Sequence, residues 1–274
     1  MDRVAGKRGR HSASHEPRLA LSAFRTSDTP TPPPFADVTG GITDWGMLGN
    51  DQYGDCGPAA TEHNRMAKAG APIPSITTTS TESLYFEYGL AQGEPGPTPD
   101  QGVDNASWLK FLFDKGIIEG YAEVNVANPD ELKQAMIDFR GVIVGCCLTD
   151  SAEAEFQAGQ PWNITPAEQP DASLGHDILL VAYGAGGYKF VTWGTEQLAT
   201  VAWESFEAQG DMDAWVIITS EDAQRADVDL PRLQAEIRAL GGTVSQVPQP
   251  PSPLPETHLS WWQDVQHWLK EHGL

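Results

Sequence analysis

The 274-residue chain carries 17 Lys and Arg against 38 Asp and Glu, which gives a formal net charge of −21. This acidic balance disfavours nucleic acid as a main partner, because phosphate binding needs clustered basic side chains. No apolar run approaches the length of a membrane span, whereas a hydrophobic content of 40% suffices for a folded core. The three cysteines, two of them adjacent at Cys146 and Cys147, do not form a disulfide framework, which indicates a reducing compartment or export without a signal.

Residues 1–37 are predicted to form an extended N-terminal arm, because Pro30 and the run from Pro32 to Pro34 enforce an extended backbone. The start of the arm is basic, with Arg3, Lys7, Arg8 and Arg10. No apolar segment follows these residues, so no secretory signal peptide is predicted and a cytoplasmic location is expected. The basic start could contact an acidic partner or the acidic surface of the protein itself, and the apolar patch from Leu19 to Phe24 could pin the arm to the body.

A turn-rich segment beginning at Asn50 leads into Cys56, where a helical pattern starts and runs to Gly70. Pro58 fits the first helical turn, in which its missing N–H is no loss. Unpaired backbone N–H groups and the positive end of the helix dipole favour a thiolate at such a position. The same groups can face the oxyanion of an acyl-transfer intermediate. Cys56 is therefore a candidate nucleophile, and a buried, inert cysteine is the alternative.

The rest of the first half is predicted to be helical and the second half to form a sheet. Helical patterns surround Leu84 to Leu90, Trp108 to Phe113 and Asn128 to Phe139. Strands are predicted where apolar runs occur, at 142–148, 176–183, 188–193 and 212–219. Turns separate these runs, and an acidic loop is predicted at about 150–172. Helices followed by a mostly antiparallel sheet indicate an α+β domain over residues 38–220.

Three further segments are predicted to follow this domain. Residues 221–242 form a short helical extension, and residues 243–256 form a Pro-rich linker. Residues 257–274 form an amphipathic helix that carries three tryptophans. Such a helix behind a stiff spacer could dock onto a partner protein, or it could fold back onto its own domain.

A nucleophilic cysteine needs a base, and of seven histidines only two lie in the body of the chain. His63 stands about 10 Å along the helix from Cys56, too far for a hydrogen bond, and is interpreted as a packing residue. His176 opens a predicted strand and is the remaining partner for Cys56. No metal-binding motif is present, the Gly184 to Gly187 run is a hairpin turn rather than a phosphate loop, and no cofactor is expected.

Three blocks of the chain, in order, resemble the signature blocks of papain-like cysteine peptidases. They are Asn50 with Gly54-Asp55-Cys56-Gly57, then Gly175 to Gly184 with His176 second, then Trp193-Gly194-Thr195. The helix and strand from Glu131 to Val144 are also similar, so that the resemblance covers residues 40–220. It implies an α+β papain-like fold, in which an N-terminal helical half packs against a mostly antiparallel β-sheet half.

The resemblance also implies roles for individual residues. Cys56 would be the nucleophile and His176 the base, and Asn50 would donate to the oxyanion where the family has glutamine. Trp193 would match the tryptophan that packs beside the partner of the histidine. Val191 occupies the position of the family's orienting asparagine, and valine cannot hydrogen-bond an imidazole. Thr192, Asp177 and Glu196 are nearby candidates for that function.

Two functions follow from these observations. The first is a thiol-dependent peptide-bond hydrolase that acts on a peptide or protein substrate through an acyl-enzyme. The alternative is a papain-fold protein with little or no turnover that binds within a larger assembly. Because similar compact domains occur among actinobacterial and actinobacteriophage proteins, a virion is one setting for that role. The region before Cys56 is short and unlike an inhibitory pro-domain.

Overall fold

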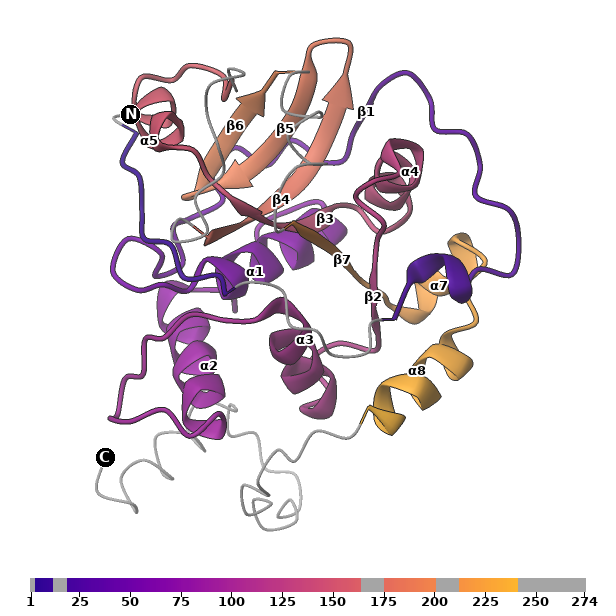
Figure 1. Ribbon diagram of the computed structural model, residues 1–274, viewed down its shortest axis with the longest axis horizontal. Helices are drawn as coiled ribbons and strands as arrows, with labels where there is room; N and C mark the ends of the chain where they lie inside the picture. Colours follow the sequence, from indigo (N-terminus) through magenta and orange to yellow (C-terminus); the bar gives the residue numbers. More distant parts are fainter. Residues whose placement is uncertain (1–2, 12–18, 164–174, 201–211, 241–274) are drawn as a thin grey trace.

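The computed structural model describes residues 3–11, 19–163, 175–200 and 212–240 (Figure 1). The predicted linker at 243–256 and the predicted Trp-rich helix at 257–274 lie outside these residues. Within the described ranges, none of the helices has both the length and the apolar character needed to cross a membrane.

Three helices make up the N-terminal half, and local capping signals define their ends. They are α1 (Cys56–Ala69), α2 (Thr78–Ala91) and α3 (Asn105–Asp114). Helix α1 ends at Gly70, which adopts the left-handed conformation with φ 66° that terminates many helices. The side chains of Thr77 and Asp104 accept hydrogen bonds from backbone N–H groups in the first turns of α2 and α3. In Figure 1 these helices lie below the sheet.

The second half is a sheet in which every described strand pair is antiparallel. Its strands are β1 (Ala36–Asp37), β2 (Tyr121–Glu123), β3 (Val142–Cys147), β4 (Gly175–Gly184), β5 (Gly187–Thr192), β6 (Thr195–Ala199) and β7 (Asp213–Ile217). The order across the sheet is β2-β7-β3-β4-β5-β6, and β1 pairs with the far end of β4. Strand β3 is buried at every position, as its continuous apolar run predicts, and Cys146 and Cys147 are core residues of it.

Helix α1 is the element that joins the two halves. Eleven of its residues, from Cys56 to Ala67, are buried. It packs against β3, β4 and β5 on one side and against α2 and α3 on the other. His63 is buried on this helix, and its Nε2 lies 2.9 Å from the carbonyl oxygen of Gly46 and 3.1 Å from that of Trp45. His63 is therefore a packing residue, and burial lowers its pKa to about 4.

Helix α4 (Pro129–Asp138) and helix α5 (Asp150–Gln157) flank the sheet. The prediction of a loop from residue 150 differs from the structure here, because α5 occupies the start of that segment. Its two inward residues, Ala152 and Phe156, are four apart and fully covered. A single apolar pair among acidic side chains is too weak a pattern to indicate a helix from sequence alone.

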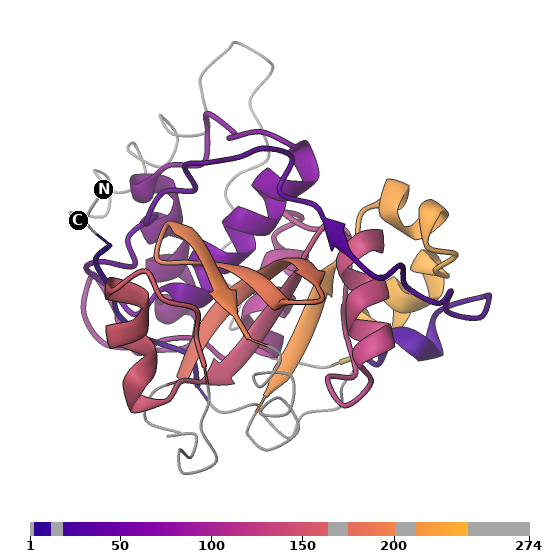
Figure 2. The same cartoon turned by 90° about the horizontal axis from the view of Figure 1, so that it is seen from above.

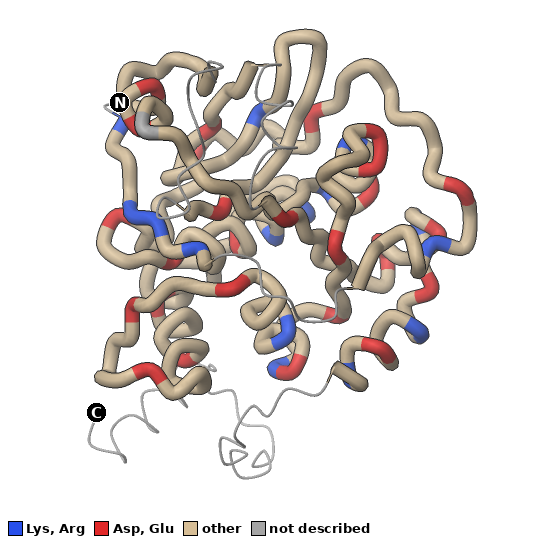
Figure 3. Tube along the Cα trace, viewed as in Figure 1, with Lys and Arg blue, Asp and Glu red and all other residues tan. Residues whose placement is uncertain are grey.

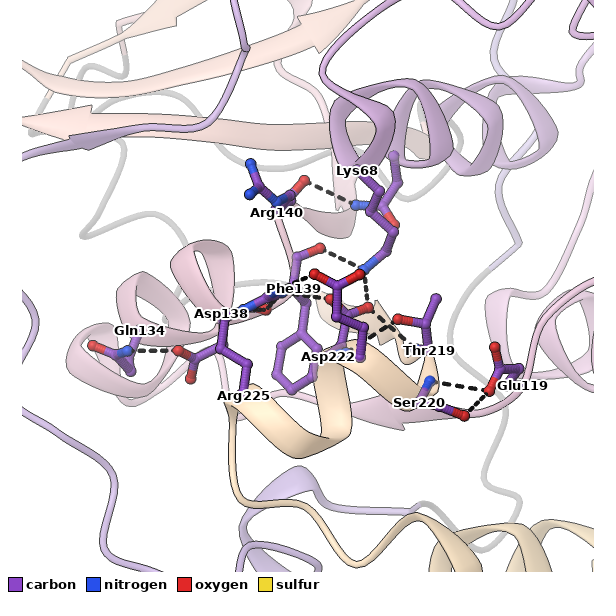
Figure 4. Close-up of polar contacts among 12 residues, drawn as sticks. Lys68, Glu119, Gln134, Asp138, Phe139, Arg140, Thr219, Ser220, Asp222 and Arg225 are labelled. Carbon is purple, nitrogen blue, oxygen red and sulfur yellow. Dashed lines mark hydrogen bonds and ion pairs between the residues drawn. The ribbon is translucent and has the colours of Figure 1, made fainter.

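Beyond the sheet, α7 (Ser220–Arg225) and α8 (Leu230–Ala239) pack on the same core (Figure 2). Leu233 and Ile237 of α8 are fully buried. Figure 4 shows how α7 is held: Lys68 of α1 donates to Asp222 at 2.6 Å, and Arg225 donates to the carbonyl oxygen of Asp138. This network ties α7 to α1 and to the end of α4.

The N-terminal arm is in contact with the body along much of its described length. Leu21 is completely buried and Phe24 is 4% exposed, so the apolar patch does pin the arm. Arg25 forms an ion pair with Asp138 at 2.7 Å. Further on, β1 adds a short edge strand to β4.

Candidate active site

Cys56 is the first residue of α1 and lies at the interface of the two halves, with 1% of its surface exposed. Its Sγ is 3.7 Å from Oδ2 of Asp177, the residue that follows His176 on β4. Burial raises the pKa of the Cys56 thiol well above its usual range, and the carboxyl group of Asp177 adds to the effect. Both effects favour the protonated thiol over the thiolate in this conformation.

His176 is completely buried near the start of β4, where it pairs with Cys146 of β3. Its Nε2 lies 2.8 Å from Oγ1 of Thr192, and its ring packs on that of Trp193 with centroids 4.7 Å apart. No described residue forms a hydrogen bond with its Nδ1. Burial, together with the charge of Arg8, lowers the pKa of His176 to about 3.

Thr192, the residue after Val191, lies where a group that orients the imidazole of His176 is expected. Successive strand residues point to opposite faces of a sheet. Val191 pairs with Leu179 and is buried, whereas the hydroxyl of Thr192 reaches the imidazole. Of the three candidates that the sequence offered for the orienting group, Thr192 is the one whose side chain contacts the imidazole.

Asn50 lies before α1 with 2% of its surface exposed. Its Nδ2 donates to the carbonyl oxygen of Lys7 at 2.9 Å and to that of Tyr53 at 3.2 Å. Nε1 of Trp193 also points to the carbonyl oxygen of Lys7, at 3.4 Å. Two N–H donors, from Asn50 and Trp193, thus converge on one carbonyl oxygen, and that oxygen belongs to the N-terminal arm.

Residues 3–11, called the strap here, cross the interface in front of Cys56. Val103 of the helical half exchanges two hydrogen bonds with the strap: its N–H donates to Gly9 at 2.7 Å, and its carbonyl accepts from His11 at 2.8 Å. From the sheet half, the carbonyl oxygen of Gly175 accepts from the N–H of Arg10 at 3.3 Å. A backbone hydrogen bond from Gly9 lowers the pKa of the Cys56 thiol, against the effect of burial. The strap therefore covers the thiol and bonds to both halves.

Glycines allow the strap to approach so closely. A Cβ on Gly9 would stand 1.7 Å from the carbonyl oxygen of Gly54, and one on Gly6 would stand 2.3 Å from that of Asn50. On the opposite wall, a Cβ on Gly102 would meet Gly9 and one on Gly175 would meet Arg10. The interface is thus shaped for an extended polypeptide backbone, and here the strap of the same chain occupies it.

Charge complements this shape. In Figure 3 the trace is blue at the Lys and Arg positions of the strap and red at the Asp and Glu positions of the surrounding elements. Arg3 donates to Gln197 at 2.5 Å and lies over the ring of Phe156, and Arg8 forms an ion pair with Glu153 of α5 at 3.2 Å. The basic start of the arm contacts the protein's own acidic surface, one of the two partners expected from the sequence. The position of the strap was missed, since nothing local in a short polar segment indicates what it binds.

The structure brings together the predicted residues Cys56, Asp177 and Asn50 around the strap, with His176, Thr192 and Trp193 in contact with one another. Among the described residues, no group of three or more His, Cys, Asp or Glu side chains is arranged to hold a metal ion.

A helical half, an antiparallel sheet half and a cysteine at the head of the helix between them define the papain-like fold. Among solved structures, the chain is similar to xylellain, a cysteine protease from Xylella fastidiosa, with a TM-score of 0.53 and 14% sequence identity over 79% of this chain and 99% of that one. It is also similar to digestive procathepsin L 3 of the Tenebrio molitor larval midgut, with a TM-score of 0.41 and 14% identity over 80% of this chain and 76% of that one. Comparison of the sequence with protein-family models and with curated proteins gives no match. The likeness to xylellain confirms the predicted α+β papain-like fold.

Proposed function

We propose that the protein is a thiol-dependent peptide-bond hydrolase in which Cys56 is the nucleophile and His176 the base. The observation that carries this proposal is the anchoring of the imidazole. Thr192 holds Nε2 at 2.8 Å, and Nδ1 has no bond to any described residue. A hydroxyl that accepts from Nε2–H leaves the Nδ1 lone pair ready to take a proton.

In the proposed reaction, Nδ1 of His176 removes the thiol proton and the Cys56 sulfur attacks the substrate carbonyl. Asn50 Nδ2 and the Cys56 backbone N–H stabilise the oxyanion that forms. The imidazolium then protonates the leaving amine, which departs and leaves a thioester on Cys56. Water, deprotonated by the same imidazole, hydrolyses the thioester and restores the thiol.

An extended polypeptide is the substrate class that fits the interface best. The strap is itself such a polypeptide, and it is bound through its backbone at Gly9, Arg10 and His11. Backbone hydrogen bonds between an extended peptide and the residues beside it are a general way of binding peptides with little dependence on sequence. The glycine walls support the same substrate class, because they leave room for main chain and little else at those positions.

The strap makes the described conformation a latent one. It uses the Asn50 amide and covers the thiol, and with water excluded the uncharged forms of Cys56 and His176 are favoured. A thiolate–imidazolium pair requires the opposite shifts in pKa, a lower value for the thiol and a higher one for the imidazole. Departure of the strap would hydrate both groups and free the donor of the oxyanion site.

The test uses a full-length Gly9→Ala variant, in which the added methyl cannot lie 1.7 Å from the Gly54 oxygen and expels the strap. Gly186→Ala is the matched control, because a Cβ there meets nothing within 4 Å. We expect Gly9→Ala to cleave a mixed peptide library and to form a thioester at Cys56 that mass spectrometry detects after acid quenching. Gly186→Ala and the wild type should be much slower, and Cys56→Ala in the Gly9→Ala background should be inactive.

If folded Gly9→Ala leaves every peptide intact, the hydrolase proposal is wrong. The alternative of a papain-fold protein that binds without turnover would then remain.

A further inference from the structure

The side chain of Arg10 occupies a buried acidic site below the strap, and the hydrolase mechanism does not use this site. Only 5% of Arg10 is exposed, and its Nη2 donates to Oδ1 of Asp213 at 2.9 Å. Asn105 donates to Oδ1 of Asp177 at 2.6 Å and lies 3.5 Å from Oδ1 of Asp213. A Cβ on Gly145 would stand 2.1 Å from Oδ1 of Asp213 and 2.2 Å from Nε of Arg10, so the absence of a side chain there makes room for the ion pair.

The site needs a cation. Asp177 and Asp213 are each 2% exposed, and a buried carboxylate without a positive partner is unfavourable. The charge of Arg10 opposes the effect of burial, which raises the pKa of Asp177 to about 7. When the strap leaves, Arg10 leaves with it, and the two acids lose their cation. A ligand that brings its own cation to the same place is therefore favoured over one that does not.

We propose that Asp177, Asp213, Asn105 and Gly145 form a recognition site for an arginine side chain of a polypeptide ligand, and that Arg10 is its intramolecular occupant. A guanidinium suits this site because its planar fork of N–H groups can serve two carboxylates at once, whereas an ammonium is a compact, strongly hydrated charge. The carboxylate of Asp213 is fixed from behind by Nε1 of Trp215 at 2.7 Å, so the site is preformed.

The position of the site relative to Cys56 defines which arginine is recognised. Asp177, one of the acids of the site, accepts a hydrogen bond from the Cys56 thiol at 3.7 Å. An arginine in the same site therefore lies close to the part of the ligand that faces the sulfur. If the hydrolase function proposed above holds, the site selects substrates with arginine near the peptide bond that is attacked. Binding of the arginine itself does not depend on that function.

The experiment measures binding to the full-length Arg10→Ala variant, whose acidic site has lost its own occupant. The probes are acetyl-Lys-Ala-Gly-Arg-His-amide, which copies residues 7–11 with alanine for the second guanidinium, and the same peptide with neutral, isosteric citrulline for arginine. We expect the arginine peptide to bind about thirtyfold or more tightly by calorimetry, the discrimination typical of a buried, hydrogen-bonded charge pair. In an Arg10→Ala/Asp213→Asn double variant that difference should largely disappear.

Equal affinities of the two peptides for folded Arg10→Ala would overturn the proposal, and this comparison needs no variant of the acidic site. Should Asp213→Asn not fold, Gly145→Ala provides the second check, because its methyl takes the space of the guanidinium and should also remove the preference for arginine. Binding that prefers arginine, in a protein that cleaves no peptide, would support this site and contradict the hydrolase function. Cleavage of peptides without any preference for arginine would support the hydrolase function and contradict the arginine site.

Discussion

At the scale of single residues, the orientation of His176 is the feature on which the proposed chemistry depends. The hydroxyl of Thr192 lies 2.8 Å from Nε2, where the proposal needs an orienting group, and the ring of Trp193 packs against the imidazole. An orienting group fixes the tautomer and direction of an imidazole, and its loss lowers the rate in comparable triads by large factors. The hydroxyl of Thr192 should therefore matter more for turnover than for folding.

The first prediction concerns this hydroxyl. In the strap-opened Gly9→Ala background, Thr192→Val should lower kcat/KM about tenfold to a hundredfold, because one hydrogen bond to the imidazole is lost while the shape is kept. Thr192→Ser, which keeps the hydroxyl, should retain most of the activity. Steady-state kinetics on one peptide substrate provides the comparison, and equal rates for the valine and serine variants would show that Thr192 does not orient the base.

A second prediction concerns Asp55, which is completely buried directly before Cys56. Burial raises the pKa of its carboxyl group from 3.8 to about 8. Between these values the unfolded chain has lost the proton while the folded protein retains it, so this group makes folding less favourable as the pH rises. Asp55→Asn, which mimics the neutral acid, should be more stable than the wild type at pH 8, by on the order of a few kcal/mol.

That gain should shrink steadily as the pH falls and vanish only below the unfolded-state pKa of 3.8, where the wild-type carboxyl group is neutral in both states. Thermal unfolding at a series of pH values measures it. A gain that is independent of pH would mean that Asp55 is ionised in the folded protein.

At the scale of elements, the strap and α7 show two ways in which distant segments are held. The strap binds mainly through its backbone, and at Arg10 through a buried ion pair. Helix α7 has only six residues, too few to be stable by itself, and is held by the pair between Lys68 and Asp222. Both side chains of this pair are largely covered, so breaking it leaves a buried charge.

The third prediction follows from this pair. Asp222→Ala should lower the free energy of unfolding by about 3 kcal/mol, because it leaves the Lys68 ammonium without its carboxylate. Glu221→Ala removes the neighbouring acid, whose side chain is 88% exposed and 3.6 Å from Arg225, and should change stability by less than about 0.5 kcal/mol. Urea unfolding of both variants tests the contrast, and equal losses would contradict the structural role of the buried pair.

At the scale of the whole molecule, periodicity in the sequence was enough to predict the class of fold and its main elements. Long apolar runs such as Val142 to Leu148, and helices with clear ends such as the one closed by Gly70, carry their own local signals. The pairing of Cys56 with His176 stays a prediction from the sequence, in which few histidines lie in the body of the chain. In the structure, the hydrogen-bond partners of these two side chains are Asp177 and Thr192.

What could not be predicted depends on contacts between segments far apart in the chain. Helix α5 carries only one inward apolar pair, and β6 pairs with β5 although its exposed Leu198 breaks the expected alternation. The strap is polar, and its partners at Asn50, Val103 and Asp213 lie 43 to 203 residues away. Such pairings become visible only when the halves of the fold have been assembled.

The central claim is that His176 activates Cys56 once the strap is displaced, and the pH dependence of Cys56 alkylation tests it most directly. Iodoacetamide labelling of Gly9→Ala, with the modified residue located by peptide mass mapping, should stay fast well below the ordinary thiol pKa of about 8.5, because the imidazole stabilises the thiolate. In Gly9→Ala/His176→Ala the profile should return to that ordinary value. If both variants follow the ordinary thiol profile, His176 does not activate Cys56 and the account is wrong.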